Sequence, residues 1–465
     1  MGRLFASLIL AALIACTPAD VAPSSGPDVA RATPAAMAVD LLPMRRFDGP
    51  PRLREPVYPN GQLARDILAL TFQLETGPKL PILTRFEGPI PVSVESVGAP
   101  PPQTLASDLA DLLDRLRREA GIDVRRTRLG EMGSITICAL PRTTLQRHAC
   151  GAACFAVPRV AGWRDYLRRP GADTDWTTLE TRNRASIFLP ADVSPQELRD
   201  CLHEELAQAL GPLNDLYRLP NSVFNDDNVH SVLTDFDMLV LRAIYHRDLH
   251  SGVTRAEVAA PLPAILDEIN PRGHRADTRP VAESPMGWNM AIGKALALRQ
   301  AAAVRRTSAR EAVRIARAEG WQDDRLAMSL LAFGRAAMTG PDEENARIAV
   351  TSFLDAARIY RNLHGTGALQ SAQVTVHLAV LVLGSGEVDE AIALLDSAIP
   401  TARGAQNAAR LSTLLMLRAR AAHLQGAEDE AAGLRREALS WGRHAWGDRF
   451  VTLRAAEVAG LRLDA

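Results

Sequence analysis

Proline and alanine are distributed very unevenly along this chain of 465 residues, and this distribution limits what each part can fold into. Twenty-seven of the 30 prolines precede Pro285, whereas the part from Pro285 onward is rich in alanine and contains only three prolines. Because proline interrupts helices and alanine favours them, the second part is predicted to be a succession of helices joined by short turns. Residues 285–465 are therefore expected to form an all-α domain.

This helical part also repeats itself. The segment that starts at Gly386 (GEVDEAI) returns in similar form at Gly426 (GAEDEAA). A second match, at nearly the same offset, pairs Ala349, Phe353 and Ala356 with Ala391, Leu395 and Ala398. Small residues at such positions let paired helices approach closely, as in a helical solenoid. The pattern resembles tetratricopeptide repeats, which implies two or three units plus flanking helices; an irregular helical bundle is the alternative.

The first sixteen residues predict the location of the protein. Arg3 precedes an apolar run, residues 4–14, that is too short to span a bilayer, and Leu-Ile-Ala-Cys16 closes it. This tetrapeptide resembles the lipobox of bacterial lipoproteins, which implies cleavage before Cys16 and lipidation of that residue. We therefore expect 1–16 to be a lipoprotein signal peptide and the protein to be anchored in the cell envelope, facing the periplasm. Thr17 after the cysteine favours the outer membrane, and an ordinary secretory signal is the alternative.

Between this leader and the helical part, the composition predicts three segments. Residues 17–60 are rich in Pro, Ala, Ser and Asp without a sustained period, which is typical of a flexible tether. Residues 61–250 show both helix-type and strand-type apolar periodicity, which predicts an α+β domain. Residues 105–121 have a helical apolar stripe, and the segment from Ser194 opens a helix that runs towards Leu210. Strands are predicted at residues 122–124, 133–138 and 185–189. Residues 251–284 are expected to be a linker.

Four cysteines remain for the exported domain once Cys16 is assigned to lipid. An even number in an oxidising compartment predicts two disulfides, and the residues alone allow three pairings. The four are Cys138, Cys150, Cys154 and Cys201. A zinc site built on Cys150 and Cys154 is the alternative, although two cysteines in a C-x3-C spacing without a second close pair are not the usual zinc pattern.

The candidate catalytic and metal-ligating residues of the sequence are concentrated in residues 201–215. A zinc-protease helix has the pattern HExxH, in which two ligands one turn apart are accompanied by a glutamate that acts as base. His203 cannot start this pattern, because Ala207 occupies the second ligand position. One residue later the longer pattern HExxHxxGxxH fits in outline. Glu204 then occupies the first ligand position and Glu205 the position of the catalytic glutamate. Gln208 and Asn214 occupy the second and third ligand positions.

Residues 61–250 resemble a bacterial family of secreted proteins and lipoproteins of unknown function, whose hallmark is a helix with the pattern EExxQxLGxxND. Residues 204–215, ending at Asp215, match that pattern. Residues 221–224 are similar to the tight Met-turn of metzincins, with Phe224 in place of the methionine, and Asp237 lies in the expected closing helix. The resemblance therefore implies a degenerate metzincin-like domain with a zincin-like α+β fold.

The same resemblance implies how the cysteines pair. In that family a Cys-Phe-Ala segment and the cysteine just before Glu-Glu tend to occur together, and Cys154 and Cys201 match these two positions. A disulfide between Cys154 and Cys201 is therefore implied, and this leaves Cys138 for Cys150.

The residue types at the ligand positions favour binding over catalysis. A glutamate and two neutral amides would form a poor zinc cage, so no cofactor is expected; the alternative is zinc or another divalent cation, such as calcium. We expect a non-catalytic domain that binds a peptide or envelope ligand. One alternative is an atypical peptidase or amidase with Glu205 as general base, its pKa raised by like-charge repulsion from Glu204. Another is a purely structural Glu–Gln network at this site. A third interpretation, for the whole chain, is an assembly scaffold that acts through the repeats, with the α/β part as a spacer.

The charge balance bears on the partners. Fifty-three basic residues against 54 acidic ones give a net charge of −1, which argues against a nucleic-acid partner. The grooves of helical-repeat arrays suit peptide segments, so we expect the repeats to dock an envelope protein or peptide, and the lipid anchor to supply the contact with the membrane.

Overall fold

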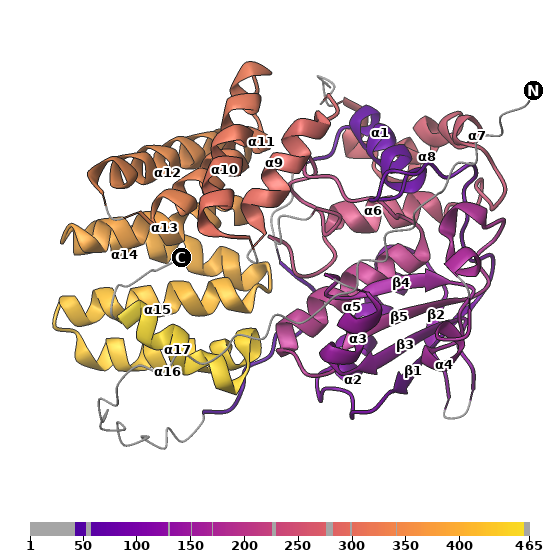
Figure 1. The fold of residues 1–465 in the computed structure, drawn as a ribbon, viewed down its shortest axis with the longest axis horizontal. Coiled ribbons are helices and arrows are strands. Elements are labelled where there is room, and N and C mark those ends of the chain that lie inside the picture. Colours follow the sequence, from indigo (N-terminus) through magenta and orange to yellow (C-terminus); the bar gives the residue numbers. More distant parts are fainter. Residues whose placement is uncertain are drawn as a thin grey trace, which may run out of the picture.

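In the computed structural model, an α/β region is followed by a region built of helices (Figure 1). The structure describes residues 42–52, 57–128, 131–149, 151–169, 171–225, 229–275, 282–297, 300–340 and 342–459. This arrangement confirms the predicted division into a mixed first part and an all-helical second part. The predicted signal peptide, with Cys16, and the first part of the predicted tether lie outside the described residues.

Within the described residues, a five-stranded sheet forms the framework of the α/β region. Its strands are β1 (Ile90–Ser96), β2 (Val124–Arg126), β3 (Ile135–Leu140), β4 (Phe155–Pro158) and β5 (Ala185–Pro190). The strands lie in the order β2-β1-β3-β5-β4, and every neighbouring pair is parallel except β5 and β4, which are antiparallel. Strand β4 therefore forms one edge of the sheet and runs against the direction of the others.

Helices surround this sheet. They are α1 (Asn60–Thr71), α2 (Leu105–Glu119), α3 (Arg142–His148), α4 (Trp163–Tyr166), α5 (Pro195–Leu210), α6 (Asp235–Ile244), α7 (Arg255–Ala259) and α8 (Leu262–Ile269). Three short 3-10 helices, η1 (Gly171–Thr174), η2 (Trp176–Thr178) and η3 (Pro271–Arg275), complete the described elements of the region. Helices α2 and α5 confirm the two helices predicted from the sequence.

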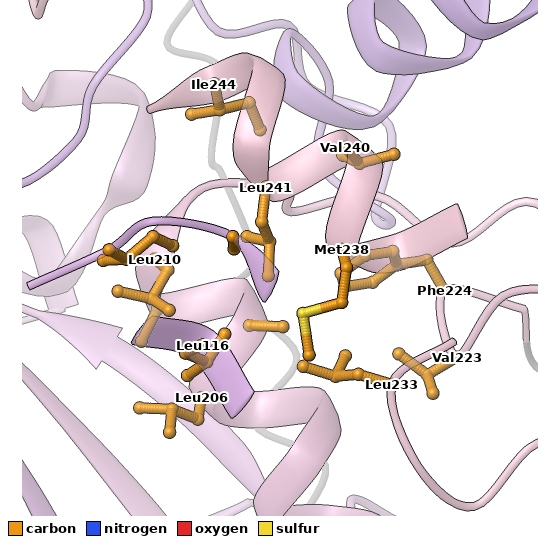
Figure 2. Packing of buried hydrophobic residues seen from close by; sticks show 14 of the residues in the cluster. Leu116, Leu206, Leu210, Val223, Phe224, Leu233, Met238, Val240, Leu241 and Ile244 are labelled. Atoms are coloured by element: carbon orange, nitrogen blue, oxygen red, sulfur yellow. The ribbon is translucent and has the colours of Figure 1, made fainter. Parts of the chain in front are cut away.

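The two faces of the sheet are covered differently, because successive side chains of a strand point to opposite sides. On one face Ile135 and Ile137 of β3 join the main core together with residues of α1, α2, α5, α6 and α8. Figure 2 shows part of this core, where Leu116, Leu206 and Leu241 from three different helices converge. On the opposite face, residues of β3 and β5 form a smaller core with α3 and α4.

The α/β region extends further along the chain than predicted. Helices α7 and α8 fall within residues 251–284, which the composition indicated as a linker. Asn60 Nδ2 at the start of α1 donates to Asp267 Oδ1 of α8 at 2.8 Å, and Asn270 Nδ2 donates to the Tyr58 carbonyl at 2.8 Å. Most of the predicted linker is therefore folded onto α1, and the boundary at residue 250 is corrected to about residue 275.

The second region contains nine helices among its described residues. They are α9 (Met286–Leu296), α10 (Ala302–Ala318), α11 (Asp324–Ala337), α12 (Glu343–His364), α13 (Leu369–Gly384), α14 (Val388–Gly404), α15 (Ala408–Leu424), α16 (Glu428–Trp446) and α17 (Asp448–Ala459). Each helix from α9 to α16 packs on the next in the sequence, which gives a helical-repeat-like architecture. Over the described residues, no helix combines the length and apolar character needed to cross a bilayer.

The repeated segments occupy equivalent places in this array. Gly386 and Gly426 both adopt positive φ angles, of 88° and 79°, in the turns before α14 and α16. A side chain is strained in that conformation, which explains why glycine recurs there. The apolar positions that match between the segments from Ala349 and from Ala391 are all buried, in α12 and α14 respectively. The sequence period therefore corresponds to one pair of helices.

Residues 42–52, which we call the strap, lie against the helical region. The ring of Phe47 stacks on Trp441 of α16 with the ring centroids 4.3 Å apart. The backbone N–H of Arg52 donates to the carbonyl of Gly404, at the end of α14, at 2.7 Å. The prediction of a solvated tether is therefore wrong for this segment, because its aromatic and backbone groups pack on the helices.

Direct contacts join the two regions. In α5, Gln196 Oε1 accepts a hydrogen bond from the backbone N–H of Ala409 in α15 at 2.9 Å. The rings of Tyr217 and Trp288 meet edge to face with their centroids 6.0 Å apart. The helix that carries the predicted site is thus in contact with the helical-repeat region.

Candidate functional site

Helix α5 carries the predicted site, and local chemistry fixes where it begins. The Ser194 side chain accepts a hydrogen bond from the backbone N–H of Glu197 at 3.2 Å, and Pro195 occupies the first turn. The sequence predicted this start from the same residues. The helix ends at Leu210.

Arg182, which no sequence motif indicated, binds the other end of α5. Its buried guanidinium donates to the backbone oxygens of Gln208, Ala209 and Gly211 at 2.6, 2.8 and 2.7 Å. The same group lies 4.7 Å from the centroid of the Trp176 ring. Burial lowers the pKa of Arg182 to about 10, so the side chain stays charged at neutral pH and interacts favourably with the negative end of the helix. No local pattern links Arg182 to a helix that starts later in the sequence.

Glu205 lies on the buried side of α5 and is only 5% exposed. The backbone N–H of Ala156, in the edge strand β4, donates a hydrogen bond to its carboxyl group. Burial raises the pKa of Glu205 to about 8, and repulsion from the carboxylates of Asp215 and Glu75 acts in the same direction. The Oε2 atom of Glu205 has no hydrogen-bond partner among the described residues. At pH 7 the Glu205 carboxyl is therefore mostly protonated.

The carboxylates that raise the pKa of Glu205 are not the neighbouring Glu204 that the sequence indicated. The enzyme alternative assigned the raised pKa of Glu205 to repulsion from Glu204, but after burial the causes are the carboxylates of Asp215 and Glu75. Successive side chains on a helix point about 100° apart, so Glu204 does not face Glu205. Asp215 follows the end of α5, and Glu75 belongs to the loop after α1. No sequence pattern indicates Glu75, because only the tertiary fold brings it close to α5.

The remaining ligand positions have different surroundings. Glu204 and Gln208, one turn apart, lie on the same half-buried face of α5, as the spacing predicted. Asn214 is buried, and its side chain points to α1, where its Nδ2 donates to the carbonyl of Ala69 at 3.0 Å. Asn214 therefore fastens the loop after α5 to α1. In the part of the chain that the structure describes, no group of three or more His, Cys, Asp or Glu side chains is placed to hold a metal ion.

His203 is a structural residue. It is fully buried, and its Nδ1 accepts a hydrogen bond from the backbone N–H of Leu233 at 3.1 Å. Burial, together with the nearby charges of Arg199 and Arg115, lowers the pKa of His203 well below its ordinary value. The neutral imidazole thus ties α5 to the segment that precedes α6.

A disulfide joins Cys154, beside β4, to Cys201 in α5. It confirms the pairing implied by the family resemblance. The link fastens the edge strand to the helix next to the contact between Ala156 and Glu205. Strand β4 and α5 are thus connected by both a covalent bond and a hydrogen bond.

The second predicted disulfide is not formed. Cys138 is a buried free thiol whose Sγ donates to Glu95 Oε2 at 3.4 Å. Its side chain points into the smaller core under α3 and α4, on the face of the sheet opposite α5. The predicted pairing of Cys138 with Cys150 is therefore wrong, and Cys150 itself lies outside the described residues.

Asp237 and Phe224 stabilise the turn that the sequence likened to a Met-turn. The fully buried carboxylate of Asp237 accepts hydrogen bonds from Ser222 Oγ at 2.6 Å and from the N–H groups of Val223 and Thr234 at 3.2 and 2.8 Å. Burial raises the pKa of Asp237 to about 6, so it is still mostly ionised at pH 7. Phe224 lies in the main core near Met238 (Figure 2). Both residues therefore have structural roles.

Comparison with known proteins shows a similarity between the α/β region and one protein family. Residues 60–264 match a family described as "Protein of unknown function (DUF2927)". The match begins at the start of α1, includes the whole sheet and α5, and ends within α8. No curated protein and no solved structure matches the chain. The match agrees with the predicted resemblance of this region to a family of unknown function and with a boundary beyond residue 250.

Proposed function

We propose that the protein is a lipid-anchored envelope protein that binds a peptide ligand without cleaving it. In this proposal the α/β region is a degenerate metzincin-like domain, and the helices α9 to α17 are tetratricopeptide-like repeats that dock a protein partner. The anchor is supported by the lipobox-like residues that end at Cys16. The repeats are supported by the two sequence matches within the helical part and by their correspondence to helix pairs.

The environment of Glu205 is the observation that carries this proposal. A catalytic base must be ionised and must face a substrate. The Glu205 carboxyl is instead buried, mostly protonated at pH 7 and hydrogen-bonded to Ala156 of the edge strand. The third ligand position is also lost to a structural contact, because the amide of Asn214 binds the backbone of α1. These contacts favour a structural role for the former catalytic position.

One observation favours the alternative, an atypical peptidase or amidase. Acid–base catalysts have pKa values near the operating pH, and the pKa of Glu205, raised by burial to about 8, lies in that range. A like-charge partner such as Asp215 is also typical of catalytic carboxylate pairs. In this alternative Glu205 would accept a proton from a water molecule at pH values above 8.

Metal analysis combined with a turnover assay separates these two candidates. Purified wild type, Glu205→Gln and the matched control Glu204→Gln are analysed for bound metal and incubated with envelope-derived peptides between pH 6 and pH 9. We expect less than stoichiometric zinc and no turnover in all three proteins. Turnover by the wild type and by Glu204→Gln, but not by Glu205→Gln, would establish the enzyme and contradict the proposal.

A further inference from the structure

A cavity of about 280 Å³ lies between the α/β region and the helical-repeat region, away from Glu205. One side is formed by the segment around Tyr58, the start of α1 and the loop near Leu219, and the other side by the start of α11 and the end of α12. A water molecule takes up about 30 Å³ in the liquid, so the cavity has room for about nine waters. This is ample room for one large side chain, and interfaces between domains are common places for ligand sites.

The wall of this cavity is largely apolar. Leu219 and Phe236 are buried in its depth, where the Phe236 ring meets Tyr58 edge to face at 5.2 Å between centroids. At the mouth, Val57 from one region and Leu363 from the other remain 40% and 45% exposed. An apolar group that entered the cavity would contact both of these side chains and bury their exposed surface.

Every charged side chain that lines the cavity already has an internal partner of opposite charge or a hydrogen-bonding partner. The three pairs are Asp66 with Arg218, Asp323 with Arg325 at 2.7 Å, and Asp324 with His364 at 2.5 Å. An incoming ion of either sign would have to compete with one of these pairs and lose part of its own hydration. A neutral group needs no such competition and gains from the apolar wall.

We infer that this cavity binds one neutral, apolar side chain of a peptide ligand, of aromatic size. The inference rests on the proposed function, because it names the pocket that would select the peptide. It also explains why the two regions are joined: neither region forms the cavity alone, so the ligand is recognised by the α/β region and the repeats together.

Ligand-observed NMR tests this pocket with N-acetyl-phenylalanine amide as the probe and N-acetyl-lysine amide and N-acetyl-aspartate amide as charged comparisons. Leu363→Trp fills the mouth of the cavity. Leu354→Trp is the matched control, because Leu354 lies on the same helix, is 55% exposed and does not line the cavity. Since both side chains are exposed, both variants should fold, and circular dichroism checks this.

We expect the phenylalanine probe to bind the wild type and the Leu354→Trp variant equally and the Leu363→Trp variant at least about tenfold more weakly. The two charged probes should bind no variant measurably. Equal binding to all three proteins, tighter binding of a charged probe, or no binding of the phenylalanine probe to the wild type would overturn the inference. Peptide cleavage in the turnover assay would refute the non-catalytic function while leaving this result intact, so the two failures are distinguishable.

Discussion

Replacing Glu205 with glutamine should make the protein more stable than wild type at pH 9, while leaving the two within about 1 kcal/mol of each other at pH 5. Burial raises the pKa of Glu205 from 4.5 to about 8 in the folded protein. Between these values the unfolded chain has released the proton and the folded chain still holds it, so a rising pH favours unfolding. The full difference amounts to up to about 5 kcal/mol and is reached above pH 8. Glutamine has no charge to bury and escapes this loss.

The measurement is urea unfolding of wild type and Glu205→Gln at a series of pH values from 5 to 9. Only the difference between the two proteins is informative, because other buried carboxyls, such as Asp200 and Asp237, have pKa values raised by burial and also contribute to the wild-type profile. Glu204→Gln is the matched control, since it removes the adjacent charge, and its difference from wild type should not grow with pH. A constant difference for Glu205→Gln would mean that this carboxyl is ionised in the folded state.

Loss of the disulfide is expected to be about as costly. Cys154 and Cys201 are 47 residues apart in the sequence, and closing a loop of that length lowers the entropy of the unfolded chain. On this basis the double variant Cys154→Ser/Cys201→Ser should lose about 4 kcal/mol of unfolding free energy. The loss should be accompanied by faster amide exchange in β4, because among the described strands this edge strand pairs with β5 alone.

Reduction supplies the control for this prediction. A reducing agent should destabilise the wild type to the level of the double variant and should leave the double variant itself unchanged. Equal stability of the oxidised wild type and the double variant would show that the link between β4 and α5 contributes nothing.

The sequence predicted the helices that are determined by residues close together along the chain. Helix α2 has a continuous apolar stripe, and α5 begins with a capping serine followed by proline, so both helices follow from neighbouring residues. The period of the repeats was equally visible, because Gly386 and Gly426 are required at equivalent turns.

The sequence could not predict the contacts made by residues that are distant along the chain. Strand β4 is only four residues long, which is too short to show an alternating pattern. It also pairs with β5, and three other elements, α4, η1 and η2, lie between the two strands in the sequence. The strap was predicted to be a tether, because its composition is polar and proline-containing. Its contacts with the helices, such as Phe47 on Trp441 and Arg52 on Gly404, join residues far apart in the sequence.

The predicted site shows the same limit. The EExxQxLGxxND pattern correctly placed Glu204, Glu205 and Gln208 on one helix, because helical spacing is a local property. What decides their chemistry comes from elsewhere: Glu75 from the loop after α1, and Ala156 from the edge strand. The expectation of a non-catalytic site rested on residue types alone and gave no account of the protonation of Glu205.

The proposed structural role of Glu205 rests on a carboxyl group that is protonated at neutral pH and does not bind zinc. Carbon-13 NMR of the glutamate carboxyl groups measures it directly, with the Glu205 signal assigned by its absence from Glu205→Gln. We expect burial and the nearby carboxylates to keep the pKa of Glu205 near 8, and added zinc to leave its titration unchanged. Titration of Glu205 near its ordinary value of 4.5, or a displacement of its signal by stoichiometric zinc, would contradict the structural role.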